Sequence, residues 1–370
     1  MFRASASLAA SRPVVLFGYE SSAFTWKARL ALKLKQIPYT FITVPSMMPR
    51  PVLKDTFGLT YRKIPVMAIG RDVYCDTSLI CEALEHFYPD KERTLYPRTA
   101  DGVNLRPMMR GFASYWIDRP YFRATCGMMP ADIWRTSFGT DRAALIGHKL
   151  DPDYLERKIP ENTWKLDQHL SMLEPLFEGR DRLQQPWIFG TPTPSLGDIA
   201  LWYQTWWCTE ISAGRLMENL TGGGIPDSPH PGAGAVFNAD RYPGIWDWYH
   251  SFSRYFDALP NVEATDPDWQ DVLKQLKGTP ELARSAWLLP TPRPAQAEID
   301  SKCGLTEGSL VSIAPDDTGK ADPTIGTLVA SSPEEFVITP QRLEKDPEVD
   351  VRVHFPRLAF VARPAKSSKI

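Results

Sequence analysis

The sequence contains no long apolar run and almost no excess charge of either sign. A membrane-spanning helix needs about 20 consecutive apolar residues, whereas the longest candidates, such as residues 199–207, are shorter and carry polar side chains. The 42 Lys and Arg nearly balance the 44 Asp and Glu, which leaves a formal net charge of −2. We therefore expect no membrane segment and no nucleic-acid partner, because nucleic-acid-binding proteins usually present a basic surface.

Cysteine is scarce as well. The chain has 5 cysteines among 370 residues, and no two of them are spaced as metal ligands are. An odd number of cysteines without a signal peptide favours reduced thiols, so we expect a cytoplasmic protein that has no metal site. The cysteines are Cys75, Cys81, Cys126, Cys208 and Cys303.

Acidic residues are missing from the first dozen positions, MFRASASLAASR. A basic, Ser/Ala-rich start has a faint similarity to a mitochondrial presequence. The alternative is a disordered start before the first strand. We favour that alternative, because an apolar strand begins already at Val14 and leaves little room for a removable segment.

Regular apolar patterns over the first 90 residues predict an α/β unit. The segments 65–70 and 71–76 are joined at Gly70-Arg71, a turn typical of a hairpin. The order of elements is βαβ, a variable connection, and ββα, which favours a four-stranded mixed sheet with helices packed on it. The expected elements are strands over 14–18, 39–44, 65–70 and 71–76, and helices over 24–35 and 77–86.

The rest of the chain changes pattern twice. Helical periods extend from about 100 to 280, with a Pro/Gly-rich loop over 222–235, and a Pro-rich linker follows near 290. Beyond it, five short alternating runs predict a small barrel or sheet appendix that carries no catalytic pattern and serves for packing or as a lid. We divide the chain into an α/β unit over 14–90, an all-helical unit over 100–285 and a β-rich extension over 295–370. Helices are expected within 103–122 and over 141–150, 161–178, 196–213, 243–257 and 267–277.

Three short motifs of the α/β unit carry polar groups at element ends. Ser21 and Ser22 stand where the helix over 24–35 begins, where serine is usually an N-cap but can also lie close to an anion. Ile64-Pro65 precedes a strand; a cis bond there would turn the backbone of Ile64 outward to pair with an extended peptide. Asp76-Thr77 starts a helix as a cap, and could also hold the ammonium and carboxylate of an amino-acid end group.

The three motifs together resemble the thioredoxin-like N-terminal domain of the glutathione transferases, in particular the zeta- and omega-like group. Residues 26–32, WKARLAL, fit the helix that follows the family's catalytic Ser or Cys, a position that Ser22 takes. The resemblance implies that Ile64 and Pro65 hold the cysteinyl backbone of glutathione. It implies further that Asp76 and Thr77 replace the usual Glu/Gln-Ser pair at the γ-glutamyl end, and that Phe24, two residues beyond Ser22, also belongs to the glutathione site.

The resemblance extends over roughly residues 14–280. Residues 195–200, SLGDIA, are similar to the family's capping box, whose role is structural. The β-rich extension lies outside the common family pattern. Fungal-type glutathione transferase-like proteins with extended C-termini are the nearest comparison for it, and the resemblance is loose. A homodimer, a hydrophobic electrophilic substrate and a role in secondary metabolism are what the resemblance implies.

The family's activity implies an enzyme that supplies an activated glutathione thiolate. A hydroxyl donor at a helix N-terminus stabilises the anion and lowers the pKa of the thiol. Ser22 is the first candidate for this donor; Tyr19, Ser21 and Thr25 are alternatives. Because position 22 holds no cysteine, thiol–disulfide exchange is disfavoured, which leaves conjugation, isomerisation by reversible addition, or reductive cleavage.

The second substrate is expected between the two larger units. Aromatic and Met side chains on the first long helix would suit an adaptable apolar pocket, although an ordinary helical core is an equal interpretation of each. The candidates are Met109, Phe112, Tyr115 and Trp116. The function alternative to a transferase or isomerase is a non-catalytic, transferase-like binding or assembly module, with the extension as its docking surface.

Overall fold

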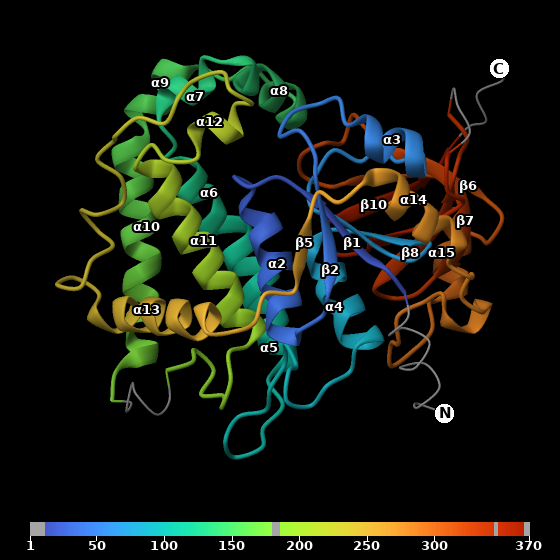
Figure 1. The fold of residues 1–370 in the computed structure, drawn as a ribbon, viewed down its shortest axis with the longest axis horizontal. Coiled ribbons are helices and arrows are strands. Elements are labelled where there is room, and N and C mark those ends of the chain that lie inside the picture. The colour runs from blue at the N-terminus through green and yellow to red at the C-terminus, as the bar shows by residue number, and fades with distance from the viewer. Residues whose placement is uncertain (1–11, 180–185, 344–346, 366–370) are drawn as a thin grey trace.

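The computed structural model describes residues 12–179, 186–343 and 347–365, so the acid-free N-terminal stretch lies almost wholly outside it. Its central feature is one sheet of ten strands in the order β10-β6-β7-β8-β9-β4-β3-β1-β2-β5. A block of helices stands beside the sheet (Figure 1). No described helix has both the length and the apolar character needed to cross a membrane.

The first strands and helices form the thioredoxin-like part of the fold. β1 pairs in parallel with β2 and antiparallel with β3, and β3 forms the expected hairpin with β4. The helix α3 has a proline in its first turn. It lies in the stretch for which the sequence predicts only a variable connection. The elements are β1 (Val14–Gly18), α2 (Ala23–Lys35), β2 (Tyr39–Thr43), α3 (Pro51–Phe57), β3 (Val66–Ile69), β4 (Asp72–Cys75) and α4 (Thr77–Phe87).

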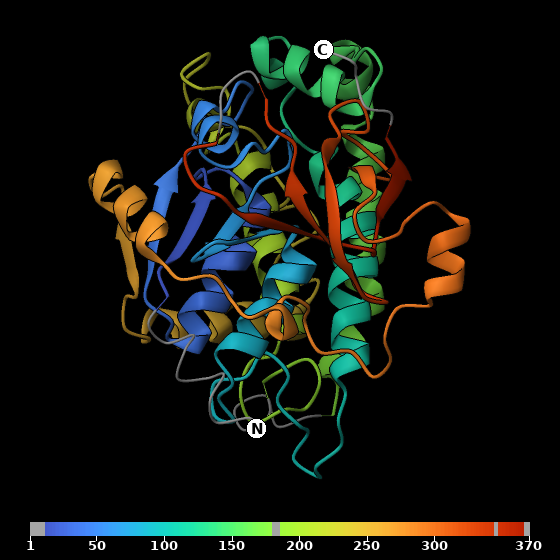
Figure 2. The same ribbon diagram turned by 90° about the vertical axis from the view of Figure 1, so that its right-hand side faces the viewer.

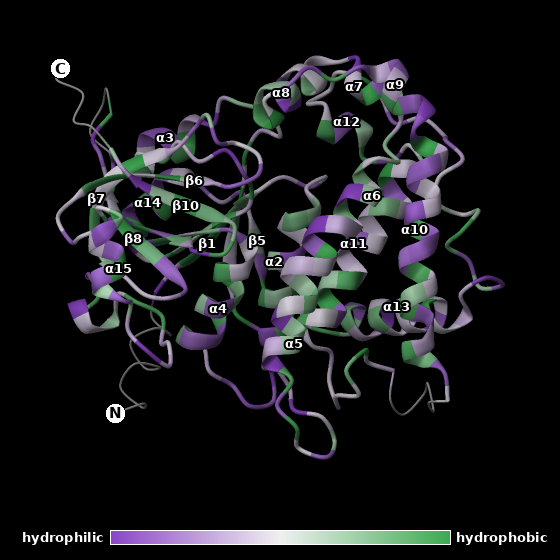
Figure 3. Cartoon of the chain, turned by 180° about the vertical axis from the view of Figure 1, so that it is seen from behind, coloured by the Kyte–Doolittle hydropathy of each residue, from purple (hydrophilic) through white to green (hydrophobic). Residues whose placement is uncertain are grey.

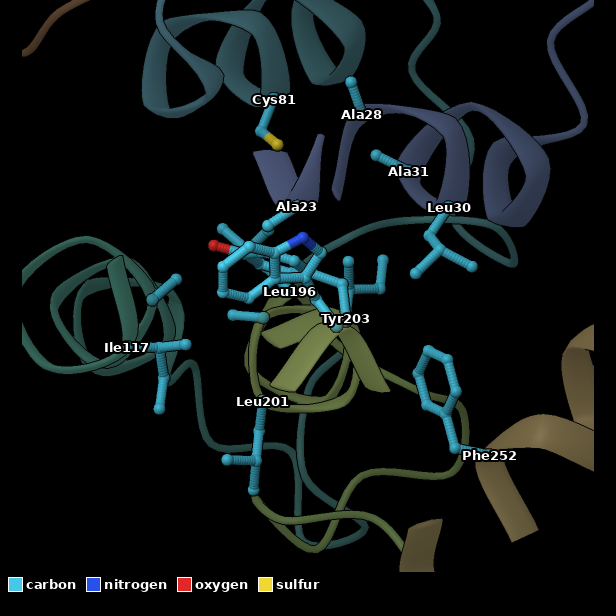
Figure 4. Packing of buried hydrophobic residues seen from close by; sticks show 14 of the residues in the cluster. Ala23, Ala28, Leu30, Ala31, Cys81, Ile117, Leu196, Leu201, Tyr203 and Phe252 are labelled. Atoms are coloured by element: carbon cyan, nitrogen blue, oxygen red, sulfur yellow. The ribbon is translucent and has the colours of Figure 1, made fainter. Parts of the chain in front are cut away.

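Each strand of this part is buried on both faces, so its residues alternate between two hydrophobic cores. Leu16 of β1 packs with α2, α4 and the helical block, whereas Phe17 packs with α3 and α14 on the other face. Figure 3 shows the hydrophobic colour along the strands. In Figure 4, small side chains of α2 such as Ala23 lie against α11, near Tyr203.

The helical block follows the expected periods, with one departure. The first long helix is expected to be regular, but its middle is a π-helix, η1, flanked by α5 and α6. Helix α11 begins with the predicted capping box, in which Ser195 accepts from the Gly197 N–H and Asp198 accepts from the Ser195 N–H. The longer elements are α5 (Arg106–Gly111), η1 (Phe112–Tyr121), α6 (Phe122–Cys126), α8 (Ser137–Ile146), α10 (Ile159–Leu173), α11 (Leu196–Ser212), α13 (Pro243–Asp257) and α14 (Trp269–Gly278). The short elements are α7 (Ala131–Trp134), α9 (Pro152–Arg157), η2 (Glu174–Phe177), α12 (Met217–Leu220), η3 (Arg284–Ala286) and α15 (Ala297–Lys302).

The C-terminal strands extend the sheet that β1, β2, β3 and β4 begin. β9 pairs in parallel with β4, and β8, β7, β6 and β10 follow in antiparallel pairs. At the other edge, the short β5 pairs with β2. Figure 2 shows the red C-terminal strands beside the blue N-terminal ones. The strands are β5 (Glu263–Thr265), β6 (Leu310–Pro315), β7 (Thr324–Ser331), β8 (Glu335–Pro340), β9 (Arg352–Pro356) and β10 (Phe360–Pro364).

This continuous sheet differs from the separate four-stranded sheet and appendix that the sequence predicts. Alternating patterns identify strands, but they do not identify which strands pair. The division into units over 14–90, 100–285 and 295–370 stays a proposal, and the first and third of these share a sheet.

A buried charged network holds β9 against β4. Arg352 donates two hydrogen bonds to Asp72, at 2.9 and 3.0 Å. His354 bridges Asp72 at 3.2 Å and Glu335 at 2.9 Å, and its ring stacks on Tyr74. Burial alone would lower the pKa of His354, but the hydrogen bonds to the two carboxylates overcome that effect and raise it to about 9. His354 is therefore charged at neutral pH.

Candidate functional site

The strand register brings the three sequence motifs to one edge of the sheet. Phe17 of β1 lies opposite Val66 of β3, which lies opposite Cys75 of β4. The residues that follow Phe17 and Cys75, and those that precede Val66, therefore leave the sheet at the same end. Ser22, Ile64-Pro65 and Asp76-Thr77 are carried by these three segments.

Ser22 is the N-cap of α2. It has an extended backbone, is nearly buried, and its Oγ accepts a hydrogen bond from the Thr25 N–H at 3.2 Å. This bond uses the hydroxyl as an acceptor only, and the Ser22 O–H has no acceptor among the described residues. A serine that caps a helix in this way still has its proton to donate to a neighbouring anion.

The alternative donors differ in how they are engaged. The Tyr19 hydroxyl accepts from Arg142 at 3.3 Å, which leaves its own O–H to donate. The Oγ of Ser21 and the Oγ1 of Thr25 are buried, and neither has a hydrogen-bond partner. Thr25 Oγ1 would lie 2.7 Å from a Cβ built on Gly18, so it packs against β1 beneath the turn.

The bond between Ile64 and Pro65 is cis. Within the described residues, neither the N–H nor the C=O of Ile64 has a hydrogen-bond partner, and the pairing of β3 begins only at Val66. The side chain of Ile64 is nearly buried. The backbone of Ile64 is thus available to an extended peptide at the edge where Ser22 lies.

Asp76 caps α4 through its Oδ1, which accepts from the Ser78 N–H at 2.9 Å and from the Ser78 hydroxyl at 2.6 Å. Its Oδ2 has no hydrogen-bond partner among the described residues. Asp76 has φ +72°, unusual for a residue with a side chain, and backbone strain of this kind concentrates at ligand sites. Thr77 follows as the first helical residue and is almost fully buried.

The Phe24 ring packs against aromatic side chains of the helical block. Its ring meets Phe122 edge-on at 5.0 Å and Tyr203 at 5.9 Å, so it packs between α2 and the helical block.

The predicted second-substrate residues lie on α5 and η1, but they do not share one face. Met109 is fully buried, and Tyr115 is 60 % exposed. Phe112 and Trp116 contact each other at 5.4 Å, and Trp116 donates to His169 of α10 at 3.1 Å. The sequence predicts the 3.6-residue period of an α-helix for this segment. In the π-helix η1 the backbone hydrogen bonds join residues five apart instead of four, so this period does not hold there. Their role in substrate binding stays a prediction.

A cluster of arginines near Tyr19 could not be identified from local sequence patterns. Arg50 is buried and donates to the carbonyl oxygens of Pro45, Ser46 and Arg62. Burial lowers the pKa of Arg50 to about 10, and the nearby guanidinium groups of Arg142 and Arg62 act in the same direction. Asp141 and Asp322 pair with Arg62 and Arg142, and the excess of positive charge that remains beside the candidate site favours an anionic ligand.

The two cations that follow Ser22 in the sequence are committed elsewhere. Lys27 is fully buried and pairs with Asp118 of η1 at 2.6 Å, which ties α2 to the helical block. Arg29 pairs with Glu20 and with Glu263 of β5. Neither cation is therefore free to meet a ligand at the α2 N-terminus.

The thiols and acidic groups offer no competing chemistry at this edge. Cys75 and Cys81 lie in β4 and α4 as expected, and burial raises the pKa of both, to about 12 for Cys81. Within the described part of the chain, no group of three or more His, Cys, Asp or Glu could hold a metal ion. Two cavities of about 900 and 460 Å³ lie beside β5, and Ser22, Ile64 and Asp76 line neither of them.

Comparison with known proteins finds a family for the first domain. The model of the glutathione S-transferase N-terminal domain matches residues 16–92, which contain all three motifs. These residues therefore form a domain of the glutathione S-transferase N-terminal family. Glutathione is the cofactor of this family, and the thioredoxin-like, helical and β-rich parts agree with the fold class that the sequence predicts. A second model, described as a domain of unknown function (DUF7962), matches residues 126–223.

The individual proteins that resemble this chain are distant from it in sequence. Glutathione S-transferase U17 of Arabidopsis thaliana is 29 % identical over 132 residues, which are 33 % of this chain and 52 % of the relative. The chain thus spans about half the length of this curated relative. A solved GST-like protein of Pseudomonas syringae shares the fold, with a TM-score of 0.58 and 22 % identity over 95 % of this chain and 99 % of the other. The tau class transferase MiGSTU of mango, Mangifera indica, gives a TM-score of 0.42 at 17 % identity over 73 % of this chain and 93 % of the other.

Proposed function

We propose that this chain is a glutathione-dependent transferase or isomerase in which Ser22 stabilises the glutathione thiolate. The observation that carries the proposal is the uncommitted O–H of Ser22 at the N-terminus of α2. The unpaired backbone of Ile64 and the free carboxylate oxygen of Asp76 leave the sheet at the same edge. The match of residues 16–92 to a glutathione S-transferase N-terminal domain supports glutathione as the ligand.

In this proposal, each part of glutathione meets a group of suitable chemistry. The Ile64 backbone pairs with the cysteinyl residue, as a strand edge pairs with a peptide. Asp76 takes the γ-glutamyl ammonium through its Oδ2, and Thr77 with the N-terminus of α4 takes the neighbouring carboxylate. The arginine cluster of Arg50, Arg62 and Arg142 supplies positive potential for a peptide that carries a net negative charge.

The chemistry follows from the thiolate. A free thiol has a pKa of about 8.5 and is mostly neutral at physiological pH. The Ser22 O–H and the N–H groups at the start of α2 favour the anion, which then attacks a hydrophobic electrophile that we place between the sheet and the helical block. Addition alone yields a conjugate, whereas addition followed by elimination isomerises a double bond. Met109, Phe112, Tyr115 and Trp116 stay our candidates for the electrophile pocket, and Phe24 for the glutathione site.

A homodimer and a role in secondary metabolism also stay proposals, and they rest on the resemblance to the family. A cytoplasmic location stays a proposal that rests on the cysteine content. β9 covers the edge of β4 among the described residues, so a second copy would have to use another surface. The alternative function, a non-catalytic binding or assembly module, would keep the fold without glutathione affinity.

We expect Asp76→Asn to weaken glutathione binding about 10- to 100-fold, because a charge-assisted hydrogen bond to the ammonium contributes about 1.5–3 kcal/mol. Asparagine keeps the capping oxygen and tolerates a positive φ, so the fold should persist. Retention on immobilised glutathione and calorimetric titration of free glutathione measure the effect.

The matched control is Asp268→Asn, at the N-cap of α14, where Asp268 accepts from the Gln270 and Asp271 N–H groups. This variant should bind like the wild type. Equal affinity of Asp76→Asn and wild type would remove Asp76 from the site, and no binding of millimolar glutathione by the wild type would favour the non-catalytic alternative.

A further inference from the structure

The C-terminal extension reaches the candidate site through the loop between β6 and β7, residues 316–323. Asp317 pairs with Lys63, the residue before Ile64, at 2.6 Å. Asp322 pairs with Arg62 at 3.2 Å, and the Thr60 hydroxyl donates to the Pro323 carbonyl at 2.8 Å. The loop thus fastens the segment that leads into the Ile64–Pro65 bond.

The same loop is also fastened to the helical block. The Gly319 N–H donates to the Leu145 carbonyl of α8 at 2.7 Å. Gly319 has φ +80°, a backbone conformation that favours glycine, and a Cβ there would stand 3.2 Å from the Leu145 side chain. The loop therefore contacts both the segment 60–63 and α8.

Ionic contacts continue from the loop to Tyr19. Arg62, held by Asp322, also pairs with Asp141 of α8 at 2.8 Å. Asp141 accepts the Met48 N–H at 3.0 Å and pairs with its neighbour Arg142, which donates to the Tyr19 hydroxyl at 3.3 Å. A continuous series of ion pairs and hydrogen bonds therefore connects the extension with the turn that carries Ser22.

We propose that the β6–β7 loop is a positioning element of the glutathione site, in which Asp317 and Asp322 hold Lys63 and Arg62 and so fix the backbone of Ile64. This inference rests on the proposed function. It assigns to the extension a task at the site, because Asp317 and Asp322, from beyond residue 315, hold the segment 60–63 together with Asp141 of α8. Asp317 and Asp322 act through Lys63 and Arg62 and do not touch the ligand.

The ion pairs that fasten the β6–β7 loop to the segment 60–63 are partly buried. Burial alone would raise the pKa of Asp317, but Lys63 outweighs that effect and keeps the pKa of this carboxyl below its usual value. Arg62 is largely buried between Asp141 and Asp322. Loss of both carboxylates leaves Ile64 with more backbone freedom before glutathione binds, and this freedom must then be lost on binding.

The test is the double variant Asp317→Asn, Asp322→Asn in the full chain. We expect the Kd and the KM for glutathione to rise about fivefold, since two partly exposed ion pairs contribute together about 1 kcal/mol, while kcat stays within about twofold. Amide hydrogen exchange of residues 58–65 without ligand should speed up. Asp317→Glu with Asp322→Glu, which keeps both charges, should restore most of the affinity.

The matched control is Glu307→Gln, which removes the exposed pair with Arg284 in the same extension and should change neither measurement. If the wild type binds glutathione and the double variant binds it equally well, the inference is overturned while the proposed function stands. If the wild type does not bind glutathione, the proposed function fails and this inference fails with it. A rise in KM that Glu307→Gln reproduces would mean a general destabilisation, and it would also overturn the inference.

Discussion

Replacing Ser22 with alanine is expected to lower kcat/KM for the conjugation of glutathione to a chlorodinitrobenzene by about 10²-fold. The variant removes the one hydroxyl that caps α2 and keeps its proton free for the thiolate. Loss of a single preorganised donor to a reacting anion costs an enzyme about 10²–10³ in rate. Steady-state kinetics at fixed pH, with saturating electrophile, measure the change.

The control must separate the loss of a donor from the loss of a helix cap, because an N-cap serine contributes about 1 kcal/mol to stability. Ser195→Ala is matched: Ser195 is also a buried serine N-cap, and its Oγ accepts from the Gly197 N–H at 3.2 Å. It should lower stability but leave kcat/KM unchanged. If Tyr19→Phe lowers kcat/KM and Ser22→Ala does not, the donor is Tyr19.

Replacing His354 with alanine is expected to lower the free energy of unfolding by about 3–5 kcal/mol at pH 7. The imidazolium bridges two buried carboxylates, Asp72 of β4 and Glu335 of β8, and its removal leaves them short of a partner. Breaking a buried charged pair from one side costs about this much. Urea denaturation followed by tryptophan fluorescence measures it.

The pH dependence tests the same network. The pKa of His354 is raised from 6.5 to about 9, so its contribution to stability is complete below about pH 6.5 and is lost as the pH rises through about 9. The difference in stability between wild type and His354→Ala should therefore shrink from pH 7 to pH 10. His148, an exposed residue, provides the control variant His148→Ala, which should be neutral. A difference independent of pH would show that His354 contributes through packing alone.

Local patterns predict the thioredoxin-like part of the fold well. The hairpin at Gly70-Arg71 and the helix that starts at Thr77 each follow from signals within a few residues. The same holds for the capping box at Ser195. The local pattern marks Ile64-Pro65 as a candidate cis bond but leaves its isomer open, and the structure has it cis. Caps, turns and alternation depend on neighbours in the chain, so they can be read without knowledge of distant contacts.

The features that the sequence does not predict depend on residues far apart in it. Arg352 and Asp72 are separated by 280 positions, yet their ion pair joins the extension to the first sheet. The arginine cluster beside Tyr19 combines a loop with α8, and the role of Asp317 requires that the extension folds back to Lys63. Nothing in the pattern around any one of these residues specifies its partner.

The central claim is that Ser22 stabilises the thiolate of bound glutathione, and the ultraviolet absorbance of the thiolate tests it most directly. Titration of the wild-type complex between pH 5 and pH 10 should give a thiol pKa below the value of about 8.5 for a free thiol. The Ser22→Ala complex should return toward that value, and Ser195→Ala should follow the wild type. Identical titration curves for wild type and Ser22→Ala would contradict the account.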